Sequence, residues 1–330
     1  MTNPVVTITP GDPNGIGPEV VARALADGSV QQVCTPVVVG SGAALDMGIE
    51  IAGAALKTRT IDEIDQARPD VGFIDVLDDG TLRPQDIDLG TNSAICGAAN
   101  AGWLKQAADL SSNGRADATV MAPVSSESLA LAKQDLSDVF GRDPADRYLT
   151  LLSGPLRIVH IFDHVLLHDV CRQISATMVT QAIKKTHSSL VDWGIDAPRI
   201  GVAGLNPHAH GPQEEDAIGP GVVKAQDDGL DVHGPIPPDT VFRHGIDGRY
   251  DVIIAMFHDQ GHIAIKTWGF VGNCALFMGA PYLFLSVGHG TAFDIVGQGI
   301  AEHRMMRSAM LQAASLAAGR GFAVPDNPQT

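Results

Sequence analysis

Positively charged residues are scarce in this chain of 330 residues. Only 22 Lys and Arg stand against 38 Asp and Glu, which gives a formal net charge of −16. Proteins that bind nucleic acid need a basic surface to displace counterions from the phosphates, and the longest basic run here is Lys184-Lys185. We therefore expect no nucleic-acid partner. With 45% hydrophobic and 18% charged residues, the composition is typical of a globular protein rather than a disordered one.

Long hydrophobic runs and paired cysteines are also lacking. No apolar run approaches the roughly 20 residues that a membrane span needs, so we expect no membrane association. The cysteines, at positions 34, 96, 171 and 274, form no CxxC pair and are interpreted as reduced thiols. The first ten residues lack a basic region followed by a long apolar run, which argues against a signal peptide. The sequence thus predicts a cytoplasmic protein.

What the chain does contain is an alternation of short β-branched runs and alanine-rich segments. Its length suits two domains better than one. We expect strands at Val5–Ile8, Thr35–Val39, Thr119–Ala122, Arg157–Phe162, Ile200–Ala203, Val252–Met256 and Tyr282–Leu285. Helices are expected at Val20–Ala26 and from Met178 to Lys185. Such repetition predicts an α/β fold with mostly parallel sheets.

Histidines follow three of the expected strands near their carboxyl ends, namely His164, His208 and His258. In open α/β sheets, ligands bind beyond the carboxyl ends of the strands. Three imidazoles that converge there would form a site for a divalent metal with positions left open for substrate oxygens. A single histidine is more often a hydrogen-bonded core or surface residue, and spacing alone leaves the two interpretations open.

Two glycine-rich loops are candidates for cofactor binding. The first, GDPNGIGPE at positions 11–19, follows an expected strand and contains Gly11, Asp12 and Gly15. It is neither the G-x-G-x-x-G fingerprint nor a P-loop, and alone it could be a turn that enters a helix. The second, at positions 287–299, could hold a ribose or an adenine, or could be a long surface connection. Its candidate residues are His289, Gly290, Thr291, Ala292 and Asp294.

In combination, these segments resemble the 4-hydroxythreonine-4-phosphate dehydrogenase family. In chain order, the matching motifs are TPGDPNGIGPEV, DHVLLHDV, GLNPHAHG, PPDTVF, AMFHDQG with Lys266, and GHGTAFDIVGQG. The first and last loops also look like those of isopropylmalate and isocitrate dehydrogenases. The resemblance implies a two-domain fold of that kind, an NAD(P) cofactor without a Rossmann fingerprint, and a homodimer with a shared active site. We expect a cofactor-side domain at 1–125 plus 285–330 and a metal, substrate and dimerisation domain at 126–284.

Residue roles follow from the same resemblance. The family's metal ligands fall on His164, His208 and His258. The resemblance does not distinguish among zinc, manganese, cobalt, nickel and magnesium as the bound ion. Its substrate-contacting lysine falls on Lys266, and catalytic carboxylates fall on Asp239 and Asp259. We expect NAD rather than NADP, because a carboxylate such as Asp294 accepts from ribose hydroxyls and repels a 2′-phosphate.

The chain also departs from the family pattern at the substrate positions. Ala275 stands where an Asn is usual and Phe284 where an Arg is usual, while Arg142 is the best match for part of a His-Thr pair. Losing a charge-assisted hydrogen bond costs roughly 1.5–3 kcal/mol, so a phosphate would be poorly held. Gly288-His289-Gly290 and HDQGH are more similar to the terephthalate cis-dihydrodiol dehydrogenase branch. This predicts oxidative decarboxylation of a non-phosphorylated cis-dihydrodiol carboxylate at a hydroxyl β to a carboxylate.

Two alternatives remain open. One is a 4-hydroxythreonine-4-phosphate dehydrogenase of pyridoxal phosphate (vitamin B6) biosynthesis, with the same fold, metal and cofactor. The other is a non-catalytic small-molecule or metal-binding protein. The presence of all three strand-end histidines together with Lys266 argues against the second alternative.

Overall fold

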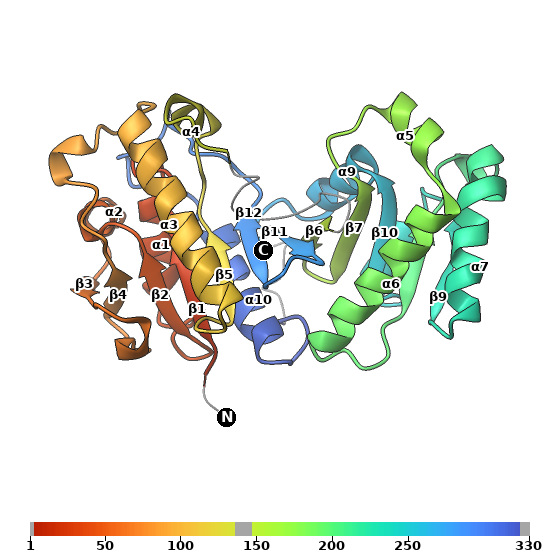
Figure 1. Cartoon of the computed structure of the whole chain (residues 1–330), viewed down its shortest axis with the longest axis horizontal. Helices are drawn as coiled ribbons and strands as arrows, with labels where there is room; N and C mark the ends of the chain where they lie inside the picture. Colours follow the sequence, from red (N-terminus) through yellow and green to blue (C-terminus); the bar gives the residue numbers. More distant parts are fainter. Residues whose placement is uncertain (1–2, 136–146, 324–330) are drawn as a thin grey trace. The chain divides into compact units, whose positions relative to one another are not determined.

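The structure, a computed structural model, describes residues 3–135 and 147–323 and divides into two compact units (Figure 1). Of the described residues, unit 1 comprises 3–135 and 281–318, and unit 2 comprises 147–280 and 319–323. The segment after 318 was predicted to belong to the cofactor-side domain, but its described part packs in unit 2. There the Gly321 N–H donates to the Trp193 carbonyl over 2.7 Å, and the ring of Phe322 meets that of Trp193 edge-on.

Unit 1 contains a sheet whose described strands all pair in parallel, in the order β3-β4-β2-β1-β5-β12. Runs such as VVTIT and TPVVV suit this sheet, since parallel strands are covered on both faces and read as nearly continuous apolar segments. The strands are β1 (Val5–Thr9), β2 (Thr35–Val39), β3 (Lys57–Thr60), β4 (Phe73–Leu77), β5 (Ala118–Met121) and β12 (Phe284–Val287).

The helices of unit 1 are α1 (Gly17–Leu25), α2 (Gly42–Ala52), α3 (Ala94–Ser112), α4 (Ser126–Leu131) and α10 (Arg304–Ala317). Three of them begin after a serine whose hydroxyl accepts a backbone N–H of the first turn: Ser41, Ser93 and Ser125. Such caps satisfy donors that the helix itself cannot. In Figure 1, α3 lies in front of the sheet, and it contacts β1, β2 and β5. Its Trp103 is fully buried in the core beneath it.

Unit 2 contains a mixed sheet in the order β11-β6-β7-β10-β8-β9. The pairings of β6 with β11 and β7 are antiparallel, whereas β7, β10, β8 and β9 run parallel. A two-residue hairpin, Gly154-Pro155, joins β6 to β7, with Gly154 at φ +56°. The strands are β6 (Tyr148–Ser153), β7 (Leu156–Phe162), β8 (Ile200–Ala203), β9 (Val232–Ile236), β10 (Val252–Phe257) and β11 (Cys274–Met278).

The helices of unit 2 are α5 (Leu167–Gln173), α6 (Ala176–Asp192), α7 (Gly219–Asp227), α8 (Val241–Ile246) and α9 (His258–Trp268), with a short 3-10 helix η5 (Pro207–Ala209) and a π-helical turn η6 (Glu214–Ile218). Helix α9 follows β10 without an intervening loop and packs on β6, β7 and β10. Because β7, β10 and β8 are parallel neighbours, their carboxyl ends lie at one edge of this sheet. That edge positions the predicted metal ligands.

The predicted α/β fold with mostly parallel sheets is confirmed. Most expected strands lie within one residue of their predicted bounds, but the strand expected at Tyr282–Leu285 lies at Phe284–Val287. Its register is set by pairing with β5, where Phe284 lies opposite Thr119. None of the helices in the described residues has the length and apolar character needed to cross a membrane.

Candidate active site

The first glycine-rich loop follows β1 in unit 1 and lies against the end of β5. The Asp12 N–H donates to the Pro123 carbonyl over 2.9 Å. Gly11 has φ +74°, and a Cβ there would lie 2.1 Å from the Pro123 oxygen. Glycine is therefore required at position 11 both by the backbone conformation and by this close approach.

Two buried polar residues organise this loop. Burial raises the pKa of Asp12, opposed by hydrogen bonds from the Ser128 side chain and the Asn14 backbone. Asn14 is fully buried, and its amide donates to the Thr91 carbonyl over 3.0 Å and accepts from the Asp88 N–H over 2.9 Å. Asn14 lies in the first glycine-rich motif, but its structural role was not predicted from the sequence. Its hydrogen bonds connect the loop to residues 88–91.

The second predicted cofactor loop lies beside the first within unit 1. The Ile16 N–H donates to the Thr291 carbonyl over 3.1 Å, and a Cβ on Gly15 would lie 2.9 Å from the Thr291 Cβ. Farther along, buried Glu19 on α1 accepts from the Ala301 N–H over 3.0 Å. Segments that are distant in sequence thus pack against one another here, and residues 11–20 of the first loop and its helix are buried.

Along the second loop, the polar side chains have different surroundings. Asp294 is exposed, with its carbonyl accepting from Gln298 over 2.9 Å. The Nδ1 atom of His289 lies 3.1 Å from the Gly290 carbonyl, and its Nε2 is buried without a hydrogen-bond partner among the described residues. Ala292 has φ +43°. The exposed carboxylate of Asp294 is the acidic group of this loop that is open to a ligand hydroxyl.

In unit 2, two of the predicted metal ligands converge at the carboxyl ends of β7 and β10. One ligand atom each from Asp163, His164 and His258 lies within 4.8 Å of the others, a spacing suited to a shared cation. The Nδ1 atom of His258 lies 2.7 Å from Asp259 Oδ1, which leaves Nε2 available. A carboxylate on the second nitrogen is the usual partner of a metal-binding histidine.

Asp163 is a residue that sequence reasoning did not select. Its Oδ1 lies 3.0 Å from His164 Nδ1 without the alignment of a hydrogen bond, and it is buried with no hydrogen-bond partner among the described residues. Imidazole and carboxylate donors suit zinc, manganese, cobalt and nickel. The donor set therefore fits a divalent cation, and the signal in the sequence was an acidic residue directly before the strand-end histidine.

His208 lies outside this three-residue group. It sits in η5 with φ +58°, a left-handed conformation that is uncommon for a residue with a side chain, and is exposed. The preceding residues are held by buried Glu214, whose carboxylate accepts the N–H groups of Leu205 and Asn206 over 2.6 and 2.8 Å. The loop that carries His208 thus has a fixed anchor at the end of β8.

Two further histidines lie against His258, and sequence reasoning selected neither. The ring of His262, one turn along α9, stacks on that of His258 with centroids 3.5 Å apart and 15° between planes. The ring of His160, on β7, lies 4.9 Å from that of His262. Burial lowers the pKa of both His160 and His262 to about 4. His160 lies inside a strand and gave no signal in the sequence. His262 follows His258 by four residues, a spacing that brings side chains together on a helix, but no helix was expected there.

The remaining predicted site residues have separate positions. Lys266 is exposed on α9, two turns after His258. Asp239 is exposed just before α8, where its carboxylate accepts from the Thr240 hydroxyl over 3.0 Å. Arg142 lies outside the described residues.

Two predicted substrate contacts are core residues instead. Phe284 is 1% exposed within the sheet of unit 1, and Ala275 is 6% exposed in the hydrophobic core of unit 2. Phe284 therefore does not form an apolar wall for a cyclic substrate, as the sequence had predicted, because its ring is enclosed by the protein. The absence of an Arg at position 284 and of an Asn at position 275 is therefore no evidence against a phosphorylated substrate.

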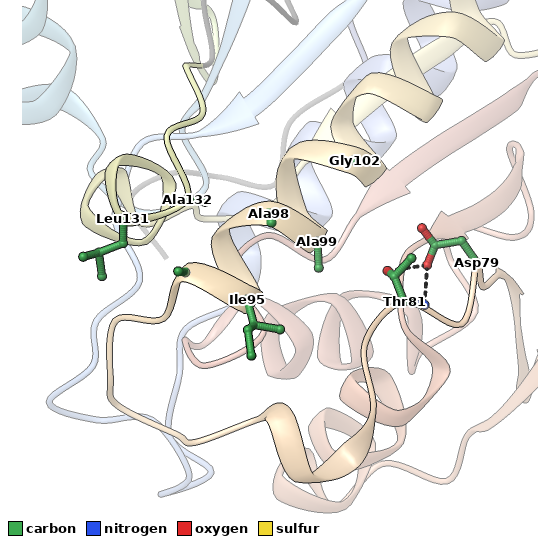
Figure 2. Close-up of a pocket in the computed structure, with 9 residues that line it drawn as sticks. Asp79, Thr81, Ile95, Ala98, Ala99, Gly102, Leu131 and Ala132 are labelled. Atoms are coloured by element: carbon green, nitrogen blue, oxygen red, sulfur yellow. Dashed lines mark hydrogen bonds between the residues drawn. The ribbon is translucent and has the colours of Figure 1, made fainter.

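A separate pocket of about 580 Å³ lies in unit 1 between α3, α4 and the turn at Asp79 and Thr81 (Figure 2). Its walls are mainly small or apolar, with Ile95 and Leu131 projecting at its rim. None of the predicted metal, cofactor or substrate residues lines it, so it is not a part of the site described above.

Comparison with known proteins shows the family and the reaction class of this chain. The chain is an NAD(P)-dependent dehydrogenase that acts on a CH–OH group, as the sequence predicted. It belongs to the family of the pyridoxal phosphate biosynthetic protein PdxA, whose model matches residues 32–313.

Curated relatives cover nearly the whole chain. One, provisionally named a 4-hydroxythreonine-4-phosphate dehydrogenase, from Novosphingobium aromaticivorans, is 49% identical over 97% of this chain and 96% of its own length. The D-threonate 4-phosphate dehydrogenase of Cupriavidus necator is 38% identical over 96% of this chain and 98% of its own length. Both names specify phosphorylated substrates.

Solved structures agree with these relatives. The 4-hydroxythreonine-4-phosphate dehydrogenase of Burkholderia phymatum has a TM-score of 0.85 at 36% identity, covering 96% of this chain and 99% of its own. The terephthalate 1,2-cis-dihydrodiol dehydrogenase of Burkholderia xenovorans has a TM-score of 0.68 at 29% identity, covering 97% and 99%. The fold is therefore the two-domain, isopropylmalate dehydrogenase-like fold that the sequence predicted.

The predicted substrate was wrong. We expected a non-phosphorylated cis-dihydrodiol carboxylate and its oxidative decarboxylation, whereas relatives at up to 49% identity are named for phosphorylated acids. The prediction depended in part on Ala275 and Phe284, which the structure buries, and in part on the similarity of two motifs to the dihydrodiol branch. The alternative weighed at the same point, a 4-hydroxythreonine-4-phosphate dehydrogenase, is the better supported assignment.

Proposed function

We propose that this chain oxidises 4-hydroxythreonine-4-phosphate with NAD as the hydride acceptor and with a divalent cation in the site. The observation that carries the proposal is the 49% identity, over 97% of the chain, to a relative provisionally named for that activity. In this molecule the 4-oxygen carries the phosphate, so the free hydroxyl is the one on carbon 3, β to the carboxylate. That hydroxyl is the group to be oxidised.

A second candidate substrate is D-threonate 4-phosphate. It is favoured by the 38% identical relative named for it, which covers nearly the whole chain. The two acids share the carboxylate, the 3-hydroxyl and the 4-phosphate, and differ at carbon 2, where one has an amine and the other a hydroxyl. A residue that contacts carbon 2 would decide between them.

We assign the cation to His164, His208 and His258, with the Asp163 carboxylate beside them. The grouping of Asp163, His164 and His258 within 4.8 Å supports this assignment. When bound, the cation would lower the pKa of the substrate hydroxyl, and the nicotinamide would accept the hydride. Asp259, 2.7 Å from His258 Nδ1, would hold that ring in the orientation that leaves Nε2 free.

We expect cationic side chains to bind the anionic groups of the substrate. Lys266 is exposed on α9, the helix that begins with His258, and would pair with the carboxylate or the phosphate or handle a proton. We assign Arg142 to the same anionic groups and Asp239 to the rim of the site. These roles rest on the family resemblance of the motifs around each residue.

The cofactor is assigned to the paired loops of unit 1, with Gly11, Asp12, Gly15 and the loop from His289 to Asp294 around it. The exposed carboxylate of Asp294 supports NAD over NADP, because it would accept from a ribose hydroxyl and repel a 2′-phosphate. Equal kcat/KM values with the two cofactors would contradict this preference.

We further propose a homodimer that shares its active site, with unit 2 providing the interface. Supporting it, three consecutive apolar side chains directly after His164 are largely exposed: Val165 at 40%, Leu166 at 74% and Leu167 at 53%. Exposed apolar clusters of this kind are typical of protein interfaces.

The experiment that tests the function is NADH formation, followed by absorbance, with each phosphorylated acid in turn. We expect turnover that is lost after treatment with a chelator and restored by adding Mn²⁺ or Zn²⁺. Full activity in the chelated enzyme would contradict the metal assignment. No turnover of either acid with any added cation would contradict the substrate class.

A further inference from the structure

We propose that His262 is a further substrate-binding residue, whose Nε2 accepts a hydrogen bond from the amine or hydroxyl on carbon 2 of the substrate. This inference rests on the proposed function, because it presumes a hydroxy acid held between His258 and Lys266. His262 would thus favour substrates that carry a hydrogen-bond donor on carbon 2, next to the carbon that is oxidised.

The first support is the position of His262 on α9. His258, His262 and Lys266 are four residues apart, so they lie on one face of the helix. The metal assignment puts the reacting hydroxyl near His258, and an anionic group of the substrate would lie near Lys266. With the substrate carboxylate at Lys266, the side chain between these two would face carbon 2, which lies between the oxidised carbon and the carboxylate.

The second support is the protonation pattern of the ring. Nδ1 of His262 lies 3.0 Å from the His258 carbonyl oxygen, which can only accept, so Nδ1 carries the hydrogen. In the neutral ring, Nε2 is then an acceptor. Among the residues that the structure describes, none makes a hydrogen bond with this atom, and the residue is only half-buried. The acceptor is left for a ligand.

The third support is the rigidity of the ring. His262 is stacked on His258 at 3.5 Å and is backed by buried His160, whose ring centroid lies 4.9 Å away. Gly261 permits this packing, because a Cβ there would lie 2.2 Å from His160 Nε2. A ring fixed on two sides loses little conformational entropy on binding, which makes a single hydrogen bond more effective.

The competing explanation is that His262 only braces the metal ligand His258 by stacking. Three substitutions separate the two roles. His262→Phe keeps an aromatic ring for stacking but removes the acceptor, and His262→Gln keeps an acceptor but removes the ring. His262→Ala removes both, and His233→Phe is a matched control at an exposed histidine of unit 2 outside the cluster.

The experiment uses the full-length protein. Mn²⁺ binding is measured by calorimetry after the metal has been removed, and substrate binding, kcat and KM are measured on the Mn²⁺-loaded enzyme. For His262→Phe we expect Mn²⁺ affinity within about twofold of wild type but substrate affinity reduced about ten- to hundredfold, the effect of one lost hydrogen bond to a charged or polar partner. For His262→Gln we expect partial rescue of KM. Mn²⁺ affinity should confirm that each variant keeps its metal site folded.

The outcomes are distinct. If the Phe variant binds substrate as tightly as wild type while the Ala variant loses Mn²⁺, the ring only braces His258 and the inference is wrong. If all three variants match wild type in both measurements, the inference is also wrong, although the proposed function stands. If wild type itself binds neither phosphorylated acid, the proposed function fails and this inference fails with it.

Discussion

At the scale of single residues, the proposed metal site has carboxylates next to its histidines in the chain. Asp259 lies 2.7 Å from His258 Nδ1, and Asp163 lies 3.0 Å from His164 Nδ1. Asp259 can fix the tautomer and the ring orientation of His258, which leaves Nε2 of that imidazole for a cation. The histidines were predictable from the strand ends, whereas these pairings required the side-chain conformations.

We predict that Asp259→Asn weakens divalent metal binding by about ten- to hundredfold while the protein remains folded, because the amide no longer orients His258. Calorimetric titration with Mn²⁺ measures the effect. Asp231→Asn is the matched control, since Asp231 pairs with His233 over 2.8 Å away from the site. Equal metal affinity in both variants would show that Asp259 does not position its neighbour.

At the scale of elements, the sequence predicted what depends on local pattern. The buried strands β2 and β8 lie at the residues expected from their β-branched runs. The strand before the second glycine-rich loop was displaced by two residues, because its register is set by pairing with β5, which is distant in sequence. For the same reason, the burial of Phe284 could not be predicted from spacing. The stacking of His262 on His258 follows from a spacing of four residues on α9, but no helix was expected at these residues.

Substitution of Ala for two different glycines of α3 should have opposite effects on the stability of the protein. A Cβ at Gly97 would lie 2.0 Å from the Ser128 carbonyl of α4, whereas one at Gly102 meets nothing within 4 Å. We expect Gly97→Ala to destabilise the protein by about 1–3 kcal/mol through overpacking. Gly102→Ala should stabilise it by about 0.5–1 kcal/mol through helix propensity. Denaturant melts of both variants measure this, and equal midpoints would contradict the packing of α3 on α4.

The loop that carries His208 predicts a pH dependence. Burial acts to raise the pKa of Glu214, but hydrogen bonds from the Asn206 side chain and from the Asn206 and Leu205 N–H groups outweigh it and hold the pKa below its usual 4.5. A carboxyl with a lowered pKa stabilises the folded state above its unfolded pKa, and this contribution is lost as pH falls through the folded pKa.

We therefore expect Glu214→Gln to melt below wild type at about pH 7, with the difference narrowing as pH falls to about pH 3. Thermal melts across this range provide the measurement. A difference in melting temperature that is independent of pH would mean that the charge of Glu214 does not stabilise the loop.

At the scale of the whole molecule, we propose that each unit binds a different reactant. Unit 1 would hold the dinucleotide at its two glycine-rich loops, and unit 2 would hold the cation and the acid at its strand ends. The α/β class was predictable from the sequence, whereas the cofactor and metal residues remain predictions from contiguous motifs. The substrate prediction was wrong in part because it used two positions whose burial is a property of the folded chain.

The exposed apolar residues after His164 predict the assembly. We expect wild type to sediment as a dimer, and Leu166→Glu to sediment as a monomer with much reduced turnover, because a buried unpaired charge opposes association. Leu131→Glu is the control, since Leu131 is equally apolar and 54% exposed but lies in unit 1. A wild-type monomer at micromolar concentration would refute the proposed dimer.

The central claim is that the substrate is a phosphorylated acid, and one comparison tests it directly. The kcat/KM for 4-hydroxythreonine-4-phosphate should be measured against that for 4-hydroxythreonine, with NAD and the same cation, because the pair differs only in the phosphate. We predict a preference of at least about a hundredfold for the phosphorylated substrate, the effect of two charge-assisted contacts. Equal kcat/KM values, or a preference for the free hydroxyl compound, would contradict the account.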